Sequence, residues 1–355
     1  MRRRRPTADV DRPDSEFVFE LAVCQWAERD WQPNHEGDGV LVARQLGTKR
    51  RRWDTIVVEC DPDALRRRAA FGPDAFDTDH LHVLRNAPAA WTYYRDALPD
   101  PGYPWRYVRE SIHELAGRDA LETRKRGNRI EIRRRAPYPD WITRIVAIEN
   151  KPDLDASAAR NLVSQLERDV ALGLADEVWV ATAATGDDIE PVLLTDMPAE
   201  AGVLTVDTDA GTAERVWQPR TLSPDEPGTR ILERPDDGVS GARFEYVDAE
   251  WKREKRLAIA ERAYERGWRA YASTMRPDCR HFRLDRAQSG VFPYCDAKAC
   301  RPTQGECRGS CPAFEPEPPT WRSKGWPVEG GPGAAIKRLL DDRRRRQRPA
   351  LPGER

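Results

Sequence analysis

The segment from residue 142 to residue 182 constrains the fold of this chain more strongly than any other part. Residues 142–151 (Ile-Thr-Arg-Ile-Val-Ala-Ile-Glu-Asn-Lys) are rich in β-branched side chains, which predicts a buried strand with charged residues at its carboxyl end. Residues 156–174 repeat leucine and valine at helical spacing, and residues 177–182 form a second apolar run. A strand, a helix and a strand in this order predict an α/β fold.

A helix and two strands are predicted nearer the amino terminus. Ser15 can cap a helix whose first turns carry Glu16 and Glu20. Residues 39–44 predict a strand, and residues 53–60 predict another that carries an aspartate at its second position. The predicted order of elements is therefore helix, strand, strand, strand, helix, strand.

The length of the chain, 355 residues, suits two or three modules better than one small domain. Between the second and third predicted strands, helical segments precede a basic hairpin with Gly127-Asn128 as its turn. This order resembles a winged helix, and an ordinary α+β insertion is the alternative. The expected organisation is a disordered arm (residues 1–15), a core (16–61 and 141–210), an inserted winged-helix-like subdomain (62–140), a linker (211–246), a helix with a cysteine-rich metal module (247–316) and a basic tail (317–355).

The distribution of charge favours a nucleic-acid partner, although the formal net charge of −1 does not. Arginine-rich runs flank the predicted strands, and such clusters bind phosphate backbones. Solvated surface is the alternative for any single run. We therefore expect DNA as the partner. The runs lie at residues 2–5, 49–52, 66–68, 124–135 and 343–346.

The apolar segments are too short for a membrane protein. None approaches the roughly 20 residues that a membrane-spanning helix needs. The basic amino terminus is followed by acidic sequence and not by an apolar secretory segment. We therefore expect a cytoplasmic protein with no membrane partner.

Three polar residues on the predicted strands suggest metal-dependent chemistry. Alternate side chains of a strand share a face, so Glu149 and Lys151 are expected to point the same way and Asn150 away. Carboxylates of Asp54 and Glu149 on neighbouring strands can hold Mg²⁺ or Mn²⁺ through hard oxygen ligands. Such a metal polarises a phosphate and activates a water, while Lys151 orients that water or stabilises negative charge. Ordinary strand-end residues are the alternative.

These residues resemble the PD-(D/E)XK, or restriction-endonuclease-like, nuclease superfamily. Its members carry an Asp on one strand and (D/E)-x-K on the next, followed by a helix and a strand. The resemblance implies an αβββαβ core that hydrolyses DNA phosphodiester bonds, with Asp54 and Glu149 as metal ligands and Lys151 as the electrostatic group. This chain departs from the superfamily pattern in the long interval, residues 55–148, between the two acids. We interpret this interval as an inserted subdomain.

The same resemblance suggests two further catalytic residues on the predicted helices. Gln165 looks like the active-site glutamine of RecB-like members of the superfamily. Glu20 matches an acid that many members place on the first helix, with Glu16 as its competitor. The expected function is a Mg²⁺-dependent DNA nuclease in repair or defence. The alternatives are a catalytically inactive DNA-binding protein that uses the insertion and the cysteine module, and a nuclease toxin or repair accessory acting within a complex.

The whole chain also resembles DUF5787, a haloarchaeal family of unknown function. The matching stretches are Phe17-Val-Phe-Glu-Leu, Val42-Ala-Arg-Gln-Leu-Gly-Thr and the cysteine-rich block. This resemblance implies no biochemical activity by itself.

Five of the seven cysteines gather near the carboxyl terminus, in the spacing C-x15-C-x4-C-x6-C-x3-C. Clustered thiolates in an intracellular protein indicate a soft-ligand metal site more than disulfides. A tetrahedral metal site needs four ligands, so one of the five cysteines is left over. We expect Cys300 to be the cysteine left over, and His281 could replace one of the other four. The expected ligands are Cys279, Cys295, Cys307 and Cys311.

The metal expected at these cysteines is Zn²⁺, and a [4Fe–4S] cluster is the alternative. Cas4-like and AddB-like nucleases of the superfamily hold such a cluster with one amino-terminal cysteine and a carboxy-terminal trio. Cys24, on the first predicted helix, could take the amino-terminal part. A buried structural cysteine is the simpler interpretation of Cys24.

Overall fold

The structure is a computed structural model, and it describes most of the chain between residues 16 and 315. The expected amino-terminal arm (residues 1–15) and basic tail (317–355) lie outside the described residues. The described ranges are 16–31, 39–154, 156–184, 197–233, 243–273, 275–287, 290–308 and 310–315.

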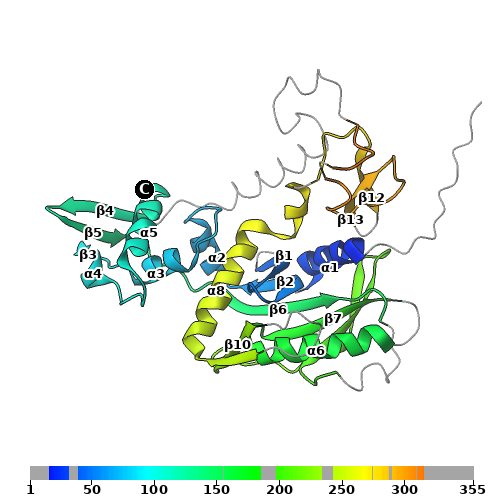
Figure 1. Cartoon of the computed structure of the whole chain (residues 1–355), viewed down its shortest axis with the longest axis horizontal. Coiled ribbons are helices and arrows are strands. Elements are labelled where there is room, and N and C mark those ends of the chain that lie inside the picture. Colours follow the sequence, from blue (N-terminus) through cyan, green and yellow to red (C-terminus); the bar gives the residue numbers. More distant parts are fainter. Residues whose placement is uncertain are drawn as a thin grey trace, which may run out of the picture.

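A mixed six-stranded sheet in the order β1-β2-β6-β7-β8-β9 forms the centre of the molecule (Figure 1). The first three strands are mutually antiparallel, β6, β7 and β8 run parallel, and β9 returns antiparallel along β8. The expected α/β class is therefore confirmed, with a mixed sheet. The strands are β1 (Val40–Gly47), β2 (Arg52–Cys60), β6 (Ile142–Asn150), β7 (Glu177–Ala183), β8 (Ala201–Asp207) and β9 (Thr212–Trp217).

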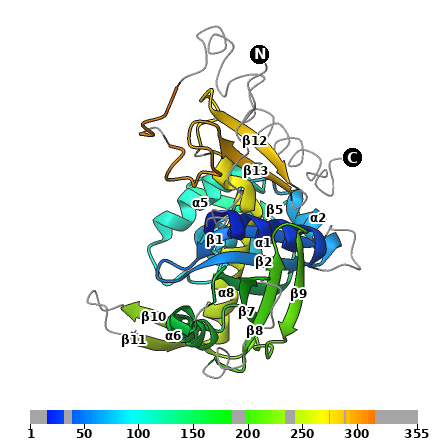
Figure 2. The same ribbon diagram turned by 90° about the vertical axis from the view of Figure 1, so that its right-hand side faces the viewer.

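Helices cover both faces of this sheet because alternate strand residues are apolar on both sides. Val146 and Ile148 of β6 pack in one cluster with helix α1 (Glu16–Asp30). Ile145 and Ala147 pack in the other with helices α6 (Ala156–Leu172) and α8 (Ala249–Arg266). Helix α1 is buried almost all round, since the carboxy-terminal module lies on its outer side (Figure 2).

The segment between β2 and β6 has its own apolar cluster, which includes Val83, Ile112 and Ile132. It contains a three-stranded sheet in the order β3-β5-β4, and the hairpin expected at Gly127 is present. Gly127 adopts a positive φ of 61°, which suits a tight turn. The elements are α2 (Pro62–Ala69), α3 (Thr78–Asn86), β3 (Thr92–Tyr93), α4 (Tyr94–Ala97), α5 (Trp105–Gly117), β4 (Leu121–Arg126) and β5 (Arg129–Arg134).

Residues 211–246, which we expected to be a linker, contain regular structure. Strand β9 extends the central sheet, and β10 (Gly228–Glu233) pairs with β11 (Arg243–Val247). The Pro/Gly-rich composition of the segment indicated a linker, and residues 218–227 between β9 and β10 do lie outside the strands. The expectation was wrong because a strand packed along an existing sheet edge needs few apolar residues of its own.

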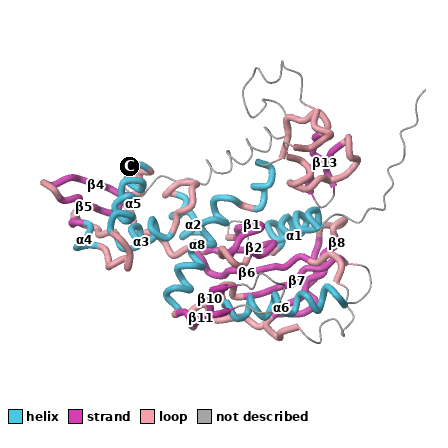
Figure 3. Tube along the Cα trace, in the orientation of Figure 1, coloured by secondary structure: helices cyan, strands magenta, loops and turns pink. Residues whose placement is uncertain are grey.

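The carboxy-terminal part of the described chain consists mostly of loops around one hairpin, β12 (Phe282–Ala287) with β13 (Gly290–Cys295) (Figure 3). A short 3-10 helix, η1 (Trp268–Ser273), connects α8 to it. In the described part of the chain, the helices lack the length and apolarity required to cross a membrane.

Candidate functional site

Asp54 and Glu149 lie opposite each other on neighbouring strands. β2 and β6 are antiparallel with Thr55 paired to Ile148, so the next pair in this register is Asp54 with Glu149. Opposed side chains in such a pair have Cβ atoms about 4.5–5.5 Å apart. The backbone N–H of Asn150 also donates to Asp54 Oδ2 at 3.0 Å. The two strands therefore pair directly across the long insertion, as a shared site for both acids requires.

The carboxylate of Glu149 is buried, with 3% of the residue exposed. Burial, and to a smaller extent the neighbouring Asp54 charge, raise its pKa to about 8. The guanidinium of Arg51 opposes this shift. A buried carboxyl group beside a second acid is stabilised either by binding a proton or by a cation in contact with it.

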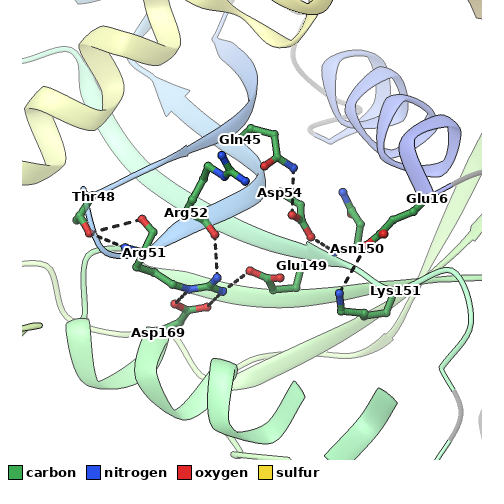
Figure 4. A network of polar contacts seen from close by, with 10 residues as sticks. All are labelled: Glu16, Gln45, Thr48, Arg51, Arg52, Asp54, Glu149, Asn150, Lys151 and Asp169. Atoms are coloured by element: carbon green, nitrogen blue, oxygen red, sulfur yellow. Dashed lines mark hydrogen bonds and ion pairs between the residues drawn. The ribbon is translucent and has the colours of Figure 1, made fainter. Parts of the chain in front are cut away.

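Arg51 supplies such a cation from the turn between β1 and β2 (Figure 4). Its Nε and Nη2 donate to the two carboxylate oxygens of Asp169 on α6, both at 2.6 Å. Nη2 also donates to Glu149 Oε1. Sequence reasoning missed Arg51 and Asp169. The run Lys49–Arg52 was expected to bind phosphate or to be solvated surface, and nothing in it indicates which side chain turns inward.

Glu20 on α1 reaches the site through Gln45. Arg44 donates to both Glu20 oxygens, at 3.0 and 2.7 Å, and Gln45 Nε2 donates to Glu20 Oε1 at 2.9 Å. The same Gln45 amide donates to Asp54 Oδ1 at 3.2 Å. Gln45 has a positive φ of 53°, which is uncommon outside glycine and asparagine. This unusual backbone directs one amide at both acids, which is typical of functional sites.

Lys151 and Glu149 contact different partners. The Nζ of Lys151 lies 3.7 Å from Glu16 Oε1 on α1, while Glu149 contacts Arg51 (Figure 4). Strand β6 ends at Asn150, so the alternation of faces along the strand does not fix the direction of the next residue. The shared orientation of Glu149 and Lys151 stays a prediction.

Gln165 lies on α6, the helix that also carries Asp169. Its Oε1 is inaccessible to solvent and has no hydrogen-bond partner among the described residues. The structure thus places Gln165 in the helix beside the acids without a polar contact to them. Its proposed catalytic part stays a prediction.

A large cavity opens on the other side of the β1–β2 turn. It has a volume of about 620 Å³ and lies between this turn, the insertion and α8. Six basic and three acidic side chains line it, so its walls favour an anion. The basic residues are Lys49, Arg50, Arg118, Arg230, Lys255 and Arg262, and the acidic ones are Asp74, Asp77 and Glu265.

The carboxy-terminal cysteines form a separate candidate site. Cys279, Cys295, Cys307 and Cys311 line one small cavity, and Cys300 is not among its lining residues. The competitor His281 instead pairs with Glu315, at 3.0 Å. Within the described ranges, no group of three or more histidine, cysteine or acidic side chains is arranged to hold a metal ion.

Cys24 is not among the residues that line this thiol cavity. Its Sγ is 3.4 Å from Thr55 Oγ1 beneath α1, and the residue is fully buried. Burial raises the pKa of its thiol well above the usual range. These surroundings fit a structural cysteine better than the amino-terminal ligand of a cluster.

Comparison with known proteins gives one match. No curated protein and no solved structure matches the chain. The model of a family of unknown function, DUF5787, matches residues 41–316, a span that includes Asp54, Glu149 and the thiol cavity. Because the match covers most of its length, this chain belongs to the DUF5787 family.

Proposed function

We propose that this protein is a Mg²⁺-dependent DNA nuclease that hydrolyses phosphodiester bonds at Asp54 and Glu149. The observation that carries the proposal is the opposed pair of carboxylates on β2 and β6, at the carboxyl end of the parallel strands β6 and β7. Burial first, and then repulsion from the Asp54 charge, raises the pKa of Glu149. A divalent cation between them would relieve that repulsion.

The donor set suits Mg²⁺, or Mn²⁺ in its place. Magnesium in proteins is usually held by one or two carboxylates together with waters and substrate phosphates. Asp54 and Glu149 would hold it here. When bound, the ion supplies polarisation of the scissile phosphate and a water of lowered pKa. Arg51 pairs with both Glu149 and Asp169 in this structure. If a metal ion replaced Arg51 beside Glu149, the guanidinium would remain paired with Asp169.

The surrounding residues have separate tasks in this proposal. Gln45 holds Asp54 in place by its hydrogen bond and links it to Glu20, so Glu20 acts as a positioning residue. Lys151 carries a charge that can stabilise the developing negative charge on phosphate once it leaves Glu16. The Nζ atom of Lys151 and the Oε1 atom of Glu16 are 3.7 Å apart at the molecular surface, so this ion pair is weak.

The order of elements supports the PD-(D/E)XK interpretation. Helix α1, strands β1, β2 and β6, helix α6 and strand β7 follow the αβββαβ sequence of that core, with β2 and β6 carrying the acids. The interval between the acids is accounted for by the segment with its own apolar cluster.

The same segment supports DNA as the substrate. Its elements run α3, β3, α4, α5, β4, β5, with β3 and β4 on either side of β5, as in a winged helix. Helix α5 exposes Arg106 and Arg109, and the hairpin tip exposes Lys125, Arg126 and Arg129. Basic side chains on a helix and an adjoining hairpin can contact the phosphates of a duplex.

A nuclease assay tests the proposal. The full-length protein is incubated with single- and double-stranded DNA and Mg²⁺ or Mn²⁺, beside Asp54→Ala, Glu149→Gln and Lys151→Ala. We expect cleavage by the unmodified protein and a loss of at least about 100-fold in each variant. Asp209→Ala, which removes an exposed carboxylate from the β8–β9 turn, should cleave normally. Equal cleavage by all proteins would remove these residues from the site.

A catalytically inactive DNA-binding protein is the second candidate. It is favoured by the contacts of Glu149 with Arg51 and of Lys151 with Glu16, which occupy both groups. Binding of DNA without cleavage, with either metal, would decide for this candidate.

Both candidates share the same DNA-binding surface, so it is tested separately. The triple variant Lys125→Ala/Arg126→Ala/Arg129→Ala should bind duplex DNA more weakly and with a salt slope reduced by about 0.9 per lost phosphate contact. Arg66→Ala/Arg67→Ala, which removes exposed charge from α2, is the control. An equal loss in the control would show that the hairpin has no special part in binding.

A further inference from the structure

The loops of the carboxy-terminal module bring four distant cysteines to one place. Cys279 precedes β12, and its carbonyl accepts a hydrogen bond from Phe282 N at 3.0 Å. Phe282 pairs across the hairpin with Cys295. The hairpin therefore places Cys279 and Cys295 at the same end, although fifteen residues separate them in sequence.

The other two cysteines reach this end through tight turns. Cys307 N donates to Thr303 O, and Cys311 N donates to Arg308 O, both at 3.0 Å. Arg276 and Lys298 line the same cavity as the four thiols. Cationic side chains beside clustered thiols favour the thiolate form, which is the form that ligates a metal.

We propose that Cys279, Cys295, Cys307 and Cys311 bind one structural Zn²⁺ ion. The four thiols line one cavity of about 20 Å³, which is room for a single atom or water. Four thiolates are the tetrahedral soft-ligand set that structural zinc prefers. Zinc binding draws the four sulfurs, which are free thiols in the described structure, onto one centre.

The bound ion would hold the module against α1. Met275, Phe282 and Phe292 of the module belong to the same apolar cluster as the buried residues of α1. Phe17 of α1 also packs edge-on against Tyr271, with ring centroids 5.7 Å apart. The module itself has little regular structure to stabilise it, and a metal commonly replaces a core in such small units. The zinc site is thus structural and does not depend on the proposed nuclease activity.

The metal content of the full-length protein tests this proposal. The protein is purified without added metal and analysed for zinc and iron by elemental analysis, then titrated with Co²⁺ as a coloured substitute for zinc. We expect about one zinc per chain and the visible spectrum of tetrahedral thiolate-bound Co²⁺. Cys307→Ser should lose the metal, whereas Cys300→Ser, outside the cavity, should retain it.

A conservative variant separates loss of a ligand from loss of folding. Cys311→His should still bind zinc, because three thiolates and one imidazole also form a tetrahedral site, whereas Cys311→Ser should not. Iron with a broad brown absorbance would overturn zinc in favour of an iron–sulfur cluster. Absence of both metals together with failure to bind Co²⁺, or equal loss of zinc in Cys300→Ser, would overturn the site itself.

Discussion

Arg51 lies between the carboxylates of Glu149 and Asp169, and only 6% of it is exposed. Both acids are buried, so each would be a costly charge without this guanidinium. A buried ion pair contributes little net stability over an apolar replacement, but the removal of one partner leaves an uncompensated charge. The residue therefore matters for stability as well as for the electrostatics of the site.

Arg51→Ala should lower the free energy of unfolding by about 3–5 kcal/mol, since the buried carboxylate of Asp169 loses the guanidinium that pairs with both of its oxygens. Urea unfolding near neutral pH measures the change. The neighbouring Arg52 is exposed, so Arg52→Ala should remain within about 0.5 kcal/mol of the unmodified protein. Similar losses in both variants would contradict the buried role of Arg51.

The raised pKa of Glu149 predicts a pH dependence of stability in the metal-free protein. Its ordinary value is 4.5 and its folded value is about 8, so the folded state binds a proton that the unfolded state releases between these values. This contribution to stability is fully present below pH 4.5 and is lost as the pH rises through 8.

We therefore expect the stability difference between the unmodified protein and Glu149→Gln to shrink, or to reverse in favour of the variant, from about pH 5 to pH 9. Urea unfolding in the presence of a chelator measures it at each pH. Other titrating groups, such as Glu20 and His80, cancel in this difference because both proteins contain them. A difference that does not change with pH would contradict the raised pKa.

The residues of the candidate site differ in how far the sequence alone could reveal them. Asp54 and Glu149 could be predicted because each lies on an apolar strand in a recognisable order. Arg51 and Gln45 could not, because each depends on the direction of one side chain. Lys151 was identified as a residue, but its orientation depends on where β6 ends.

At the scale of elements, the contact between β7 and β8 depends on the absence of a side chain at Gly202. A Cβ atom built there would lie 2.6 Å from Trp179 Cε3 and 2.7 Å from Pro219 Cδ. The large, fully buried Trp179 ring fills the space that this glycine leaves. The position is fixed by packing and not by an unusual φ.

Gly202→Ala should destabilise the protein by about 1–3 kcal/mol through overpacking. Thermal or urea unfolding measures the loss. Gly117→Ala, at the end of α5 with nothing within 4 Å of the added carbon, should cause no loss of stability. If Gly202→Ala were as stable as this control, the close approach of Trp179 would be wrong.

Elements with strong local signals could be predicted from the sequence, and weakly marked ones could not. The β4–β5 hairpin was marked by Gly127-Asn128 between basic strands. Strand β9 was missed because its residues are mostly exposed and show no strong apolar alternation, and it forms along the edge of β8. The partners that stabilise such a strand are distant in sequence.

At the scale of the whole molecule, a buried ion pair joins the segment after β2 to the long carboxy-terminal helix. Arg68 on α2 and Glu261 on α8 have no exposed side-chain surface, and Arg68 Nε donates to Glu261 at 2.7 Å. Tyr138 and the backbone N–H of Phe76 also donate to this carboxylate. The insertion is thereby attached to α8 as well as to the sheet.

Arg68→Ala should cost about 3–5 kcal/mol and make the insertion more sensitive to limited proteolysis, because Glu261 keeps a buried charge. Arg66→Ala on the same helix removes an arginine whose side chain is 60% exposed, and it should change stability by less than about 0.5 kcal/mol. Equal protease sensitivity of the two variants would show that the ion pair does not hold the insertion.

The sequence by itself determined the α/β class, the two acid-bearing strands and the group of five clustered cysteines, because these depend on local apolar patterns and on residue type. Only the tertiary structure decided that Asp54 faces Glu149 across the insertion and that Arg51 pairs with both Glu149 and Asp169. It also decided that Cys300 lies outside the thiol cavity and that residues 211–246 contain strands. These features depend on strand register and on side-chain direction between distant segments, and local patterns do not specify either.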